Sequence, residues 1–272
     1  MSFPGPGVHT QMLDWGIDMT ELTQNVSPID MAVRIDPGPR DFAALNEVVR
    51  KGSRIGNESL DEDGHLNEII PKPWGLEYRI YVDDFIDVWN LKIDEGESTS
   101  MHVHPRKLTY LLCLAGQGVT ETLTGEVPVG SGSVLRIGGG AFHSSRSIGP
   151  GPLWLVEVEA PRNKFDLIRL RDTYDRQGTA YERHHTEAPE LPARPVTYLP
   201  QARLRDRSPG AEFAFSIRAG ADVFYRRQER DLFHIPLGLT GVVTGEVDIL
   251  APAQGDVRRP ALDQYYLSLA LA

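Results

Sequence analysis

Short apolar runs separated by glycine-rich or acidic turns occupy most of the chain after residue 69. In the run 85–93, apolar and polar positions alternate, which is typical of a strand whose two faces meet different surroundings. We expect further strands on either side of it, at 79–82, 108–114, 119–123, 133–137 and 153–159. The runs 108–114 and 119–123 flank Gly116-Gln117-Gly118, which predicts a hairpin between them. Many short strands joined by glycine turns predict an all-β fold, either a barrel or a jelly roll.

The N-terminal part of the chain has a different pattern. Residues 1 to about 40 are rich in proline and glycine and show little periodicity, which indicates an extended arm. After the arm, apolar residues recur at helical spacing, so we expect one short amphipathic helix with Asp41 as its N-cap and Lys51-Gly52 as its stop. The acidic stretch 56–67 is interpreted as a solvated loop.

A shift in composition near Tyr181 indicates a third part of the chain. Polar residues and prolines from there to Pro195 are typical of a linker. The apolar runs that follow predict a β-rich extension, interpreted as a degenerate second copy of the barrel, with strands at 213–217, 222–225, 232–236, 241–250 and 265–271. His234 stands alone there, so this part is expected to be structural. The predicted units are therefore an arm and helix at 1–68, a barrel at 69–187 and the extension at 188–272.

Composition narrows the classes of function. The net charge of -10 over 272 residues argues against a surface for nucleic acid or anionic lipid. No apolar run is long enough to span a membrane, and the first residues do not have the pattern of a signal peptide. Cys113 is the single cysteine, so we expect no internal disulfide and a reducing, cytoplasmic location. A small-molecule substrate is the partner that fits these properties.

Three histidines carry the candidate chemistry. His102 and His104 are two residues apart, so on an extended strand their side chains point to the same face. His143 follows a glycine turn at 138–140 and is placed to complete a facial set of imidazoles around one divalent metal. These ligands do not identify the metal, which we expect to be iron, zinc, nickel or manganese. Three histidines also leave coordination positions exchangeable, as a catalytic metal requires.

The spacing of glycines and histidines in segments 96–116 and 132–147 resembles the two sequence motifs of the cupin superfamily. The positions that match are Gly96, His102, His104, Gly116, Gly132 and His143. The resemblance implies a β-barrel with three of the four usual metal ligands. Thr109 stands where those motifs have a glutamate. We therefore expect three histidines plus water or substrate, unless a carboxylate such as Glu121 substitutes.

The segments that flank the predicted barrel resemble the type II mannose-6-phosphate isomerase branch of cupins. Pro73-Trp74-Gly75 opens the barrel, and the segment 166–176 closes it with the pattern Asp-Leu-Ile-Arg-Leu-Arg-Asp-Thr-Tyr-Asp-Arg. This resemblance spans residues 70 to 182 and implies a carbohydrate or sugar-phosphate setting. Cupin arms often cover a neighbouring subunit, which implies a homodimer. We interpret Trp74 as packing against the barrel wall and Arg169 as part of ion pairs that hold the closing segment, with direct contact to a substrate as the alternative for both.

Three functions remain open at this point. The first is a metal-dependent enzyme of isomerase or epimerase type that acts on a small polar, carbohydrate-like or sugar-phosphate-like molecule. The second is a three-histidine non-haem Fe(II) dioxygenase acting on a small metabolite, because oxygen-using cupins can lack the carboxylate ligand. The third is a cupin that binds a carbohydrate or metabolite without turnover. Thr109 is expected near the metal as a hydrogen-bond partner of bound water or substrate, with Tyr110, Glu121 and Arg136 as further catalytic candidates.

Overall fold

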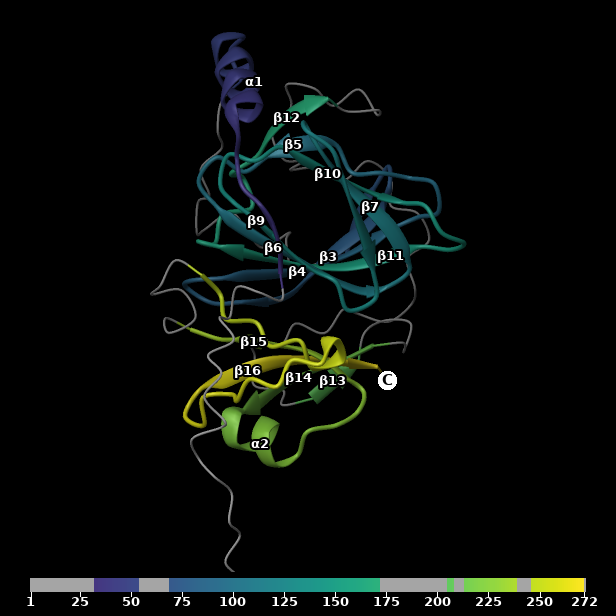
Figure 1. Ribbon diagram of the computed structural model, residues 1–272, viewed down its shortest axis with the longest axis vertical. Helices are drawn as coiled ribbons and strands as arrows, with labels where there is room; N and C mark the ends of the chain where they lie inside the picture. Colours follow the sequence, from purple (N-terminus) through teal and green to yellow (C-terminus); the bar gives the residue numbers. More distant parts are fainter. Residues whose placement is uncertain (1–31, 54–68, 172–204, 208–212, 239–245, 272) are drawn as a thin grey trace, which may run out of the picture.

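The computed structural model describes residues 32–53, 69–171, 205–207, 213–238 and 246–271 (Figure 1). The predictions for the arm before residue 32, the loop at 56–67 and the linker at 181–195 lie outside these residues. No described helix is long and apolar enough to cross a membrane.

Two sheets face one another and form a barrel (Figure 1). The strands of the larger sheet are β1 (Val33–Ile35), β2 (Ile70–Lys72), β3 (Gly75–Val82), β4 (Asp87–Ile93), β6 (Leu108–Ala115), β9 (Val134–Ile137) and β11 (Leu153–Ala160). Those of the smaller sheet are β5 (Met101–Val103), β7 (Gln117–Thr122), β8 (Glu126–Gly130), β10 (His143–Ser147) and β12 (Ile168–Arg171). Within the described ranges the orders are β1-β9-β6-β11-β4-β3-β2 and β12-β5-β10-β7-β8. The predicted all-β barrel is confirmed.

The end of the predicted arm joins the barrel. Strand β1 pairs in parallel with β9, and helix α1 (Pro39–Arg50) follows it. The predicted N-cap is wrong, because Gly38 is the N-cap and Asp41 lies in the first turn. The Asp41 carboxylate accepts hydrogen bonds from the backbone N–H groups of Gly38 at 2.9 Å and Phe142 at 2.8 Å. Asp41 thereby ties the helix to the chain just before strand β10.

Strand β11 separates two apolar cores. Successive residues of a strand point to opposite faces. Leu153 and Leu155 pack inside the barrel, whereas Val156 and Val158 pack on the outside of the larger sheet. All four side chains are fully buried. Burial on both faces explains why the strand is apolar along most of its length.

The described C-terminal residues form an antiparallel sheet on the outer face of the larger barrel sheet (Figure 1). Its strands are β13 (Arg205–Arg207), β14 (Phe213–Ala219), β15 (Asp231–Pro236) and β16 (Tyr265–Leu271), in the order β13-β14-β16-β15. Phe213, Phe233 and Leu267 share one apolar core with Val156 and Val158. The predicted β-rich extension is confirmed, and it stabilises the barrel wall through this common core.

The strand predicted at 222–225 is wrong, because helix α2 (Gly220–Tyr225) occupies this position. A Cβ on Gly220 would overlap the backbone carbonyl of Ala261, so the chain approaches too closely there for any other residue. Arg218 Nε donates to Asp222 Oδ2 at 2.9 Å and holds the helical turn. Val223 packs into a small core while Phe224 is partly exposed. An apolar run this short does not distinguish strand from helix.

The predicted hairpin around Gly116 is also wrong. Strand β6 pairs with β9 and β11, whereas β7 pairs with β8 and β10, so the two strands belong to different sheets. Gly116 has a φ of +90°, and a Cβ there would lie 2.5 Å from the carbonyl oxygen of Pro152. The short glycine loop therefore turns the chain from one sheet into the other.

This crowding leads to a prediction for Gly116→Ala. We expect the substitution to lower the free energy of unfolding by about 3 kcal/mol or more. The left-handed φ is unfavourable for alanine, and the added Cβ would also displace the neighbouring backbone. Gly96→Ala is the matched control, since Gly96 has a φ of +79° but no atom within 4 Å of an added Cβ. Gly96→Ala should lower the free energy of unfolding, measured by urea denaturation, by about 1 kcal/mol. Equal losses for the two variants would contradict the steric account.

Candidate metal centre

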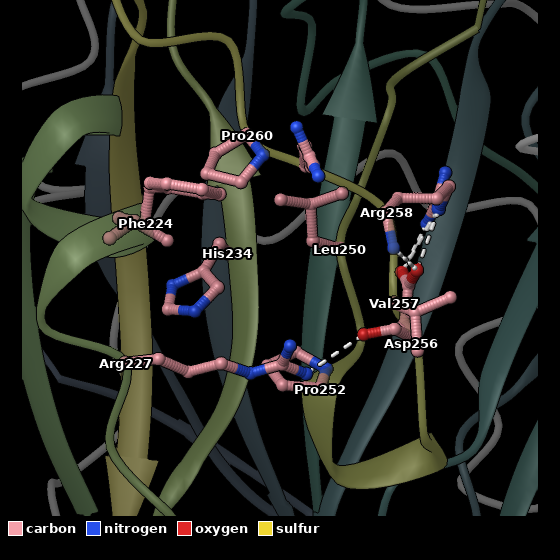
Figure 2. A pocket seen from close by; sticks show the side chains of 11 residues that line it. Phe224, Arg227, His234, Leu250, Pro252, Asp256, Val257, Arg258 and Pro260 are labelled. Atoms are coloured by element: carbon pink, nitrogen blue, oxygen red, sulfur yellow. Dashed lines mark hydrogen bonds and ion pairs between the residues drawn. The ribbon is translucent and has the colours of Figure 1, made fainter. Parts of the chain in front are cut away.

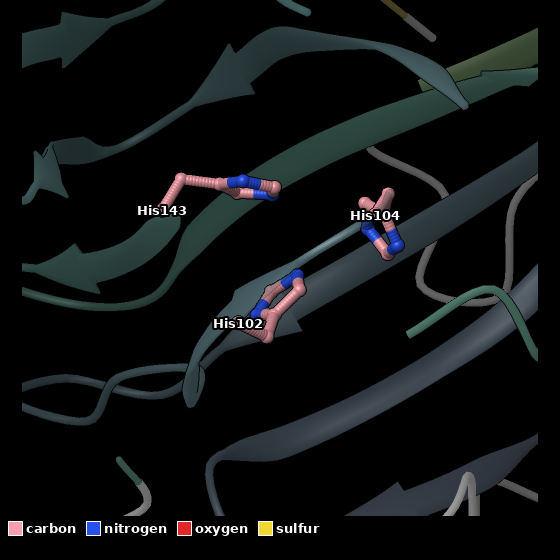
Figure 3. Close-up of side chains that lie close together, drawn as sticks. All are labelled: His102, His104 and His143. Atoms are coloured by element: carbon pink, nitrogen blue, oxygen red, sulfur yellow. The ribbon is translucent and has the colours of Figure 1, made fainter. Parts of the chain in front are cut away.

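Two neighbouring strands of the smaller sheet bring the three predicted histidines together. His102 lies in β5, His104 follows it directly, and His143 begins β10 opposite His102. Each histidine offers a ring nitrogen, and these atoms lie within 4.8 Å of one another. Figure 3 shows the three imidazoles turned toward a common space. The predicted grouping of the histidines is therefore present in the fold.

Backbone carbonyls fix the orientation of all three rings. The Nδ1 atoms lie 2.7 Å from the Ser100 oxygen for His102, 2.7 Å from the Asp166 oxygen for His104 and 3.1 Å from the Ala141 oxygen for His143. A carbonyl only accepts hydrogen bonds, so we assign the proton of each ring to Nδ1. Each Nε2 then carries a lone pair. A second hydrogen bond that fixes the ring in this way is usual for histidines that bind metal.

The histidine site fits a divalent transition metal. The buried Nε2 atom of His104 has no hydrogen-bond partner among the described residues. Burial, followed by the neighbouring His104, lowers the pKa of His143 to about 4. Burial, then His143 and His104, lowers the pKa of His102 well below its usual value. Neutral imidazoles with their lone pairs directed at one point are the form that binds a metal.

A carboxylate that sequence reasoning did not select lies beside these imidazoles. Glu157 Oε1 lies 3.8 Å from His104 Nε2. Glu157 faces the interior because it continues the inward series of Leu153 and Leu155 along β11. Glu157 can supply the carboxylate that is missing at the position of Thr109. The signal in the sequence is the pair Glu157 and Glu159, which share one face of an otherwise apolar strand.

Of the four residues predicted as catalytic, Thr109 points into the barrel. Thr109 lies opposite Glu159 in the pairing of β6 with β11, and such partners share a face. Its side chain is 1% exposed, and its hydroxyl has no hydrogen-bond partner among the described residues. Its contact with bound water or substrate stays a prediction.

The structure does not bring Tyr110 and Arg136 to the histidines. Both lie on the outer face of the larger sheet, where the Tyr110 hydroxyl donates to Glu246 Oε2 at 2.7 Å and Arg136 Nε donates to the same atom at 2.6 Å. Tyr110 follows Thr109 directly, so strand alternation turns it to the opposite face. These two residues instead connect the barrel to the C-terminal part.

Glu121 is also turned away from the histidines. In the pairing of β7 with β10, Thr122 lies opposite His143, and Glu121 lies opposite Ser144 on the other face. Glu121 Oε1 accepts a hydrogen bond from Arg146 Nε at 3.2 Å. The alternative carboxylate of the site is therefore Glu157 rather than Glu121.

A buried cluster of acids and lysines lies behind the histidines. Lys164 Nζ lies 3.1 Å from Glu157 Oε2 and 3.9 Å from both Glu77 Oε1 and Glu159 Oε1. Lys107 Nζ lies 2.6 Å from Glu159 Oε1. We name these five residues the acid–lysine cluster. Buried ion pairs contribute little net stability, so a cluster in this position is a candidate for function.

The acid–lysine cluster keeps Glu157 ionised. Burial alone would neutralise Lys164, but Glu77, Glu157 and Glu159 outweigh it and raise the pKa of Lys164. Burial would also raise the pKa of Glu157, but Lys164, His104 and Lys107 together outweigh it and hold that pKa well below its usual range. A carboxylate therefore faces the imidazoles at neutral pH.

A cavity of about 50 Å³ opens beside the histidines. Its lining includes Trp74, His102, His104, Glu157, Lys164 and Arg169. Arg169 lies opposite His102 in the pairing of β12 with β5. Trp74 packs in the apolar core inside the barrel, and both Trp74 and Arg169 line this cavity, so the sequence-based alternative of substrate contact stays open for both.

Metal content tests the histidine site. We expect wild-type protein to hold close to one equivalent of a transition metal after reconstitution, and His143→Ala to lose it, because two imidazoles do not replace three. Elemental mass spectrometry after removal of free metal measures both. His234→Gln, a histidine outside the cluster, is the control and should keep the metal. Equal metal content in the two variants would refute the assignment.

Asp87 provides a test of the electrostatics inside the barrel. Asp87 is 0% exposed, and burial followed by Glu159 raises its pKa to about 7. The folded state thus binds more protons than the unfolded state between about pH 4 and pH 7, so stability falls as pH rises through this window. Asp87→Asn removes this dependence of stability on pH. Relative to wild type, it should gain about 2 kcal/mol in free energy of unfolding between pH 5 and pH 8 in urea titrations.

The control for Asp87→Asn is Asp94→Asn. Asp94 is a half-exposed acid whose carboxylate lies 2.7 Å from Lys92 Nζ. Its substitution should shift stability equally at both pH values to within a few tenths of a kcal/mol. A pH-independent difference between wild type and Asp87→Asn would show that Asp87 is not protonated in the folded state.

The solved structures that this chain resembles match less than half of it. No family model matches the sequence, and no curated protein sequence matches it. Among solved structures, the capsular polysaccharide assembling protein CapF from Staphylococcus aureus is 19% identical over 38% of this chain and 34% of that chain, with a TM-score of 0.35. This chain thus matches about a third of the length of CapF.

Two further solved structures match a similar share of the chain. A conserved protein with a double-stranded β-helix domain from Klebsiella pneumoniae is 18% identical over 38% of this chain and 84% of that chain, with a TM-score of 0.33. A sugar phosphate isomerase of the cupin superfamily from Silicibacter pomeroyi is 18% identical over 29% of this chain and 52% of that chain, with a TM-score of 0.28. Likenesses this distant say nothing of the reaction. The fold itself is a two-sheet β-barrel with His102 on β5 and His143 on β10.

Proposed function

We propose that this protein is a metal-dependent enzyme that isomerises or epimerises a small polar, sugar-phosphate-like substrate. The observation that supports it is an ionised, buried carboxylate, Glu157, beside His104 of the three convergent imidazoles, at a cavity that His102 and His104 also line. His102, His104 and His143 would hold the metal, which as a Lewis acid polarises a carbonyl or hydroxyl group. Such reactions also need a group that accepts a proton from the adjacent carbon.

Glu157 is suited to accept that proton. Its Oε2 atom lies 3.1 Å from Lys164 Nζ, which leaves Oε1 on the side of His104. Lys164 is held in turn by Glu77 and Glu159, so the carboxylate is fixed in orientation. Lys164 also keeps Glu157 ionised before the proton transfer. A base that is oriented and unprotonated in the resting state needs no rearrangement before it acts.

The cavity favours a substrate with an anionic group. Lys72, Lys164 and Arg169 line it together with Glu77 and Glu157. Ammonium and guanidinium groups are the usual partners of phosphate and carboxylate. The small volume of about 50 Å³ suits the reacting end of such a molecule. These properties support a phosphorylated or carboxylated substrate over a neutral sugar.

A three-histidine Fe(II) dioxygenase is the second candidate. Thr109 occupies the position of the usual carboxylate ligand, and Glu157 is already paired with Lys164. If Glu157 stays with Lys164, three neutral imidazoles and open positions remain, a set that suits non-haem iron. A cupin that binds its ligand without turnover is the third candidate.

Hydrogen exchange distinguishes these functions. Protein loaded with zinc, manganese or anaerobic iron is incubated in D2O with a panel of aldose and ketose phosphates. An isomerase or epimerase that uses Glu157 as base introduces deuterium next to the carbonyl carbon, which NMR detects. Glu157→Gln should lower this exchange by about 100-fold or more with metal content unchanged. Glu121→Gln, on the opposite face of the sheet, is the control and should exchange at the wild-type rate.

Other results would select the alternatives. Oxygen uptake by the iron-loaded protein, without deuterium exchange, would indicate the dioxygenase. Ligand binding with neither exchange nor oxygen uptake would indicate a binding cupin. Full exchange by Glu157→Gln would refute the role of Glu157 as the base.

A further inference from the structure

A second cavity lies in the C-terminal part, on the face of its sheet that is turned away from the barrel. Phe233 and Ile235 of β15 pack toward the barrel in the shared apolar core. Strand alternation places His234 on the other face, where it lines a cavity of about 160 Å³ (Figure 2). Helix α2 and the chain around the short 3-10 helix η4 (Pro252–Gln254) complete its walls. The cavity is therefore separate from the histidine cluster.

The walls of this cavity combine apolar side chains with charged ones, among them the Asp256 carboxylate, which Arg258 contacts. Val223, Phe224, Leu250, Pro252 and Val257 line it. An apolar cavity of roughly 150 Å³ is large enough to bind a benzene ring. The space therefore suits a compact, ring-sized apolar group.

His234 offers a buried polar atom to this cavity. The side chain is 2% exposed, and its Nδ1 atom lies 2.8 Å from the Ser268 hydroxyl. Its Nε2 atom has no hydrogen-bond partner among the described residues and lies 3.7 Å from Asp231 Oδ2. The nearby carboxylate favours the proton on Nε2, with the Ser268 hydroxyl donating to Nδ1. Asp231 Oδ2 at 3.7 Å is too far away to accept a hydrogen bond, and buried donors are rarely left without an acceptor, so this N–H is available to a ligand oxygen.

Two arginines add positive charge at the rim. Among the described residues, neither Arg227 nor Arg259 forms an ion pair with a carboxylate. Arg227 Nη2 donates to the backbone oxygen of Asp256 at 2.8 Å, and the Arg259 guanidinium lies 5.8 Å from the Phe224 ring centre. Arg258 differs, because the carboxylates of Asp256 and Asp248 both contact it. Figure 2 shows the Arg227 side chain running below His234 toward Pro252.

We propose that this cavity binds a small carboxylate with an apolar, ring-sized body. The carboxylate would accept hydrogen bonds from His234 Nε2 and from the guanidinium of Arg227, with Arg259 adding positive charge. The ring would pack against Phe224, Leu250 and the other apolar walls. A planar guanidinium matches a carboxylate in geometry. This site is independent of the function proposed for the metal centre.

Benzoate is the probe for this site. The titration uses full-length His143→Ala protein without metal, so that coordination at the metal centre does not contribute. We expect benzoate to bind with a Kd below about 1 mM by calorimetry or ligand-observed NMR. Benzyl alcohol, which keeps the ring without the charge, should bind about tenfold more weakly or worse. Inorganic phosphate, which has the charge without the ring, should bind more weakly than benzoate.

Variants of adjacent arginines locate the binding. Arg227→Gln should weaken benzoate binding about tenfold or more, because a charge-assisted hydrogen bond is lost. Arg226→Gln is the matched control, since Arg226 is 77% exposed and its Nη1 atom lies 3.4 Å from Asp222 Oδ1. It should leave the Kd unchanged. The proposal is overturned if benzoate does not bind, if both variants weaken it equally, or if phosphate binds as tightly as benzoate.

Discussion

The alternation of β11 is the constraint on which the rest of the structure depends. Its inner face presents Glu157 to His104, with Glu157 Oε1 3.8 Å from His104 Nε2. Its outer face places Val156 and Val158 in the core that the barrel shares with the C-terminal sheet. A strand with both faces buried cannot slip by one residue without exchanging the two sets of side chains. The candidate site and the docking of the C-terminal part are therefore fixed by the same register.

Electrostatics inside the barrel follow from this register. Removing a carboxylate from water costs several kcal/mol unless a cation compensates it. Lys164 and Lys107 compensate Glu157 and Glu159 within the acid–lysine cluster. The same pairing helps to keep Glu157 ionised, while burial lowers the pKa values of His102 and His143. Charge compensation inside the barrel thus follows from the same strand register as the packing.

The C-terminal part has two faces with different properties. One face closes the apolar core on the barrel, as a structural extension should. The other carries His234 and a cavity with arginines at its rim. From the sequence, a lone histidine in this part predicts a structural role, because one imidazole does not make a metal site. A single buried histidine can instead act as a hydrogen-bond donor, and only its surroundings show that.

Local spacing determined much of what the sequence predicted. Strand periodicity identified most of the barrel strands, and the interval of two between His102 and His104 placed both rings on one face, because these are properties of neighbouring residues. Contacts between distant segments were decided only in the tertiary structure. The turn at Gly116 changes sheets, Tyr110 faces outward to Glu246, and Glu157 meets Lys164 inside the barrel. Each of these three features depends on which strands become neighbours. The cost of burying an unpaired charge then determines which charged side chains pair.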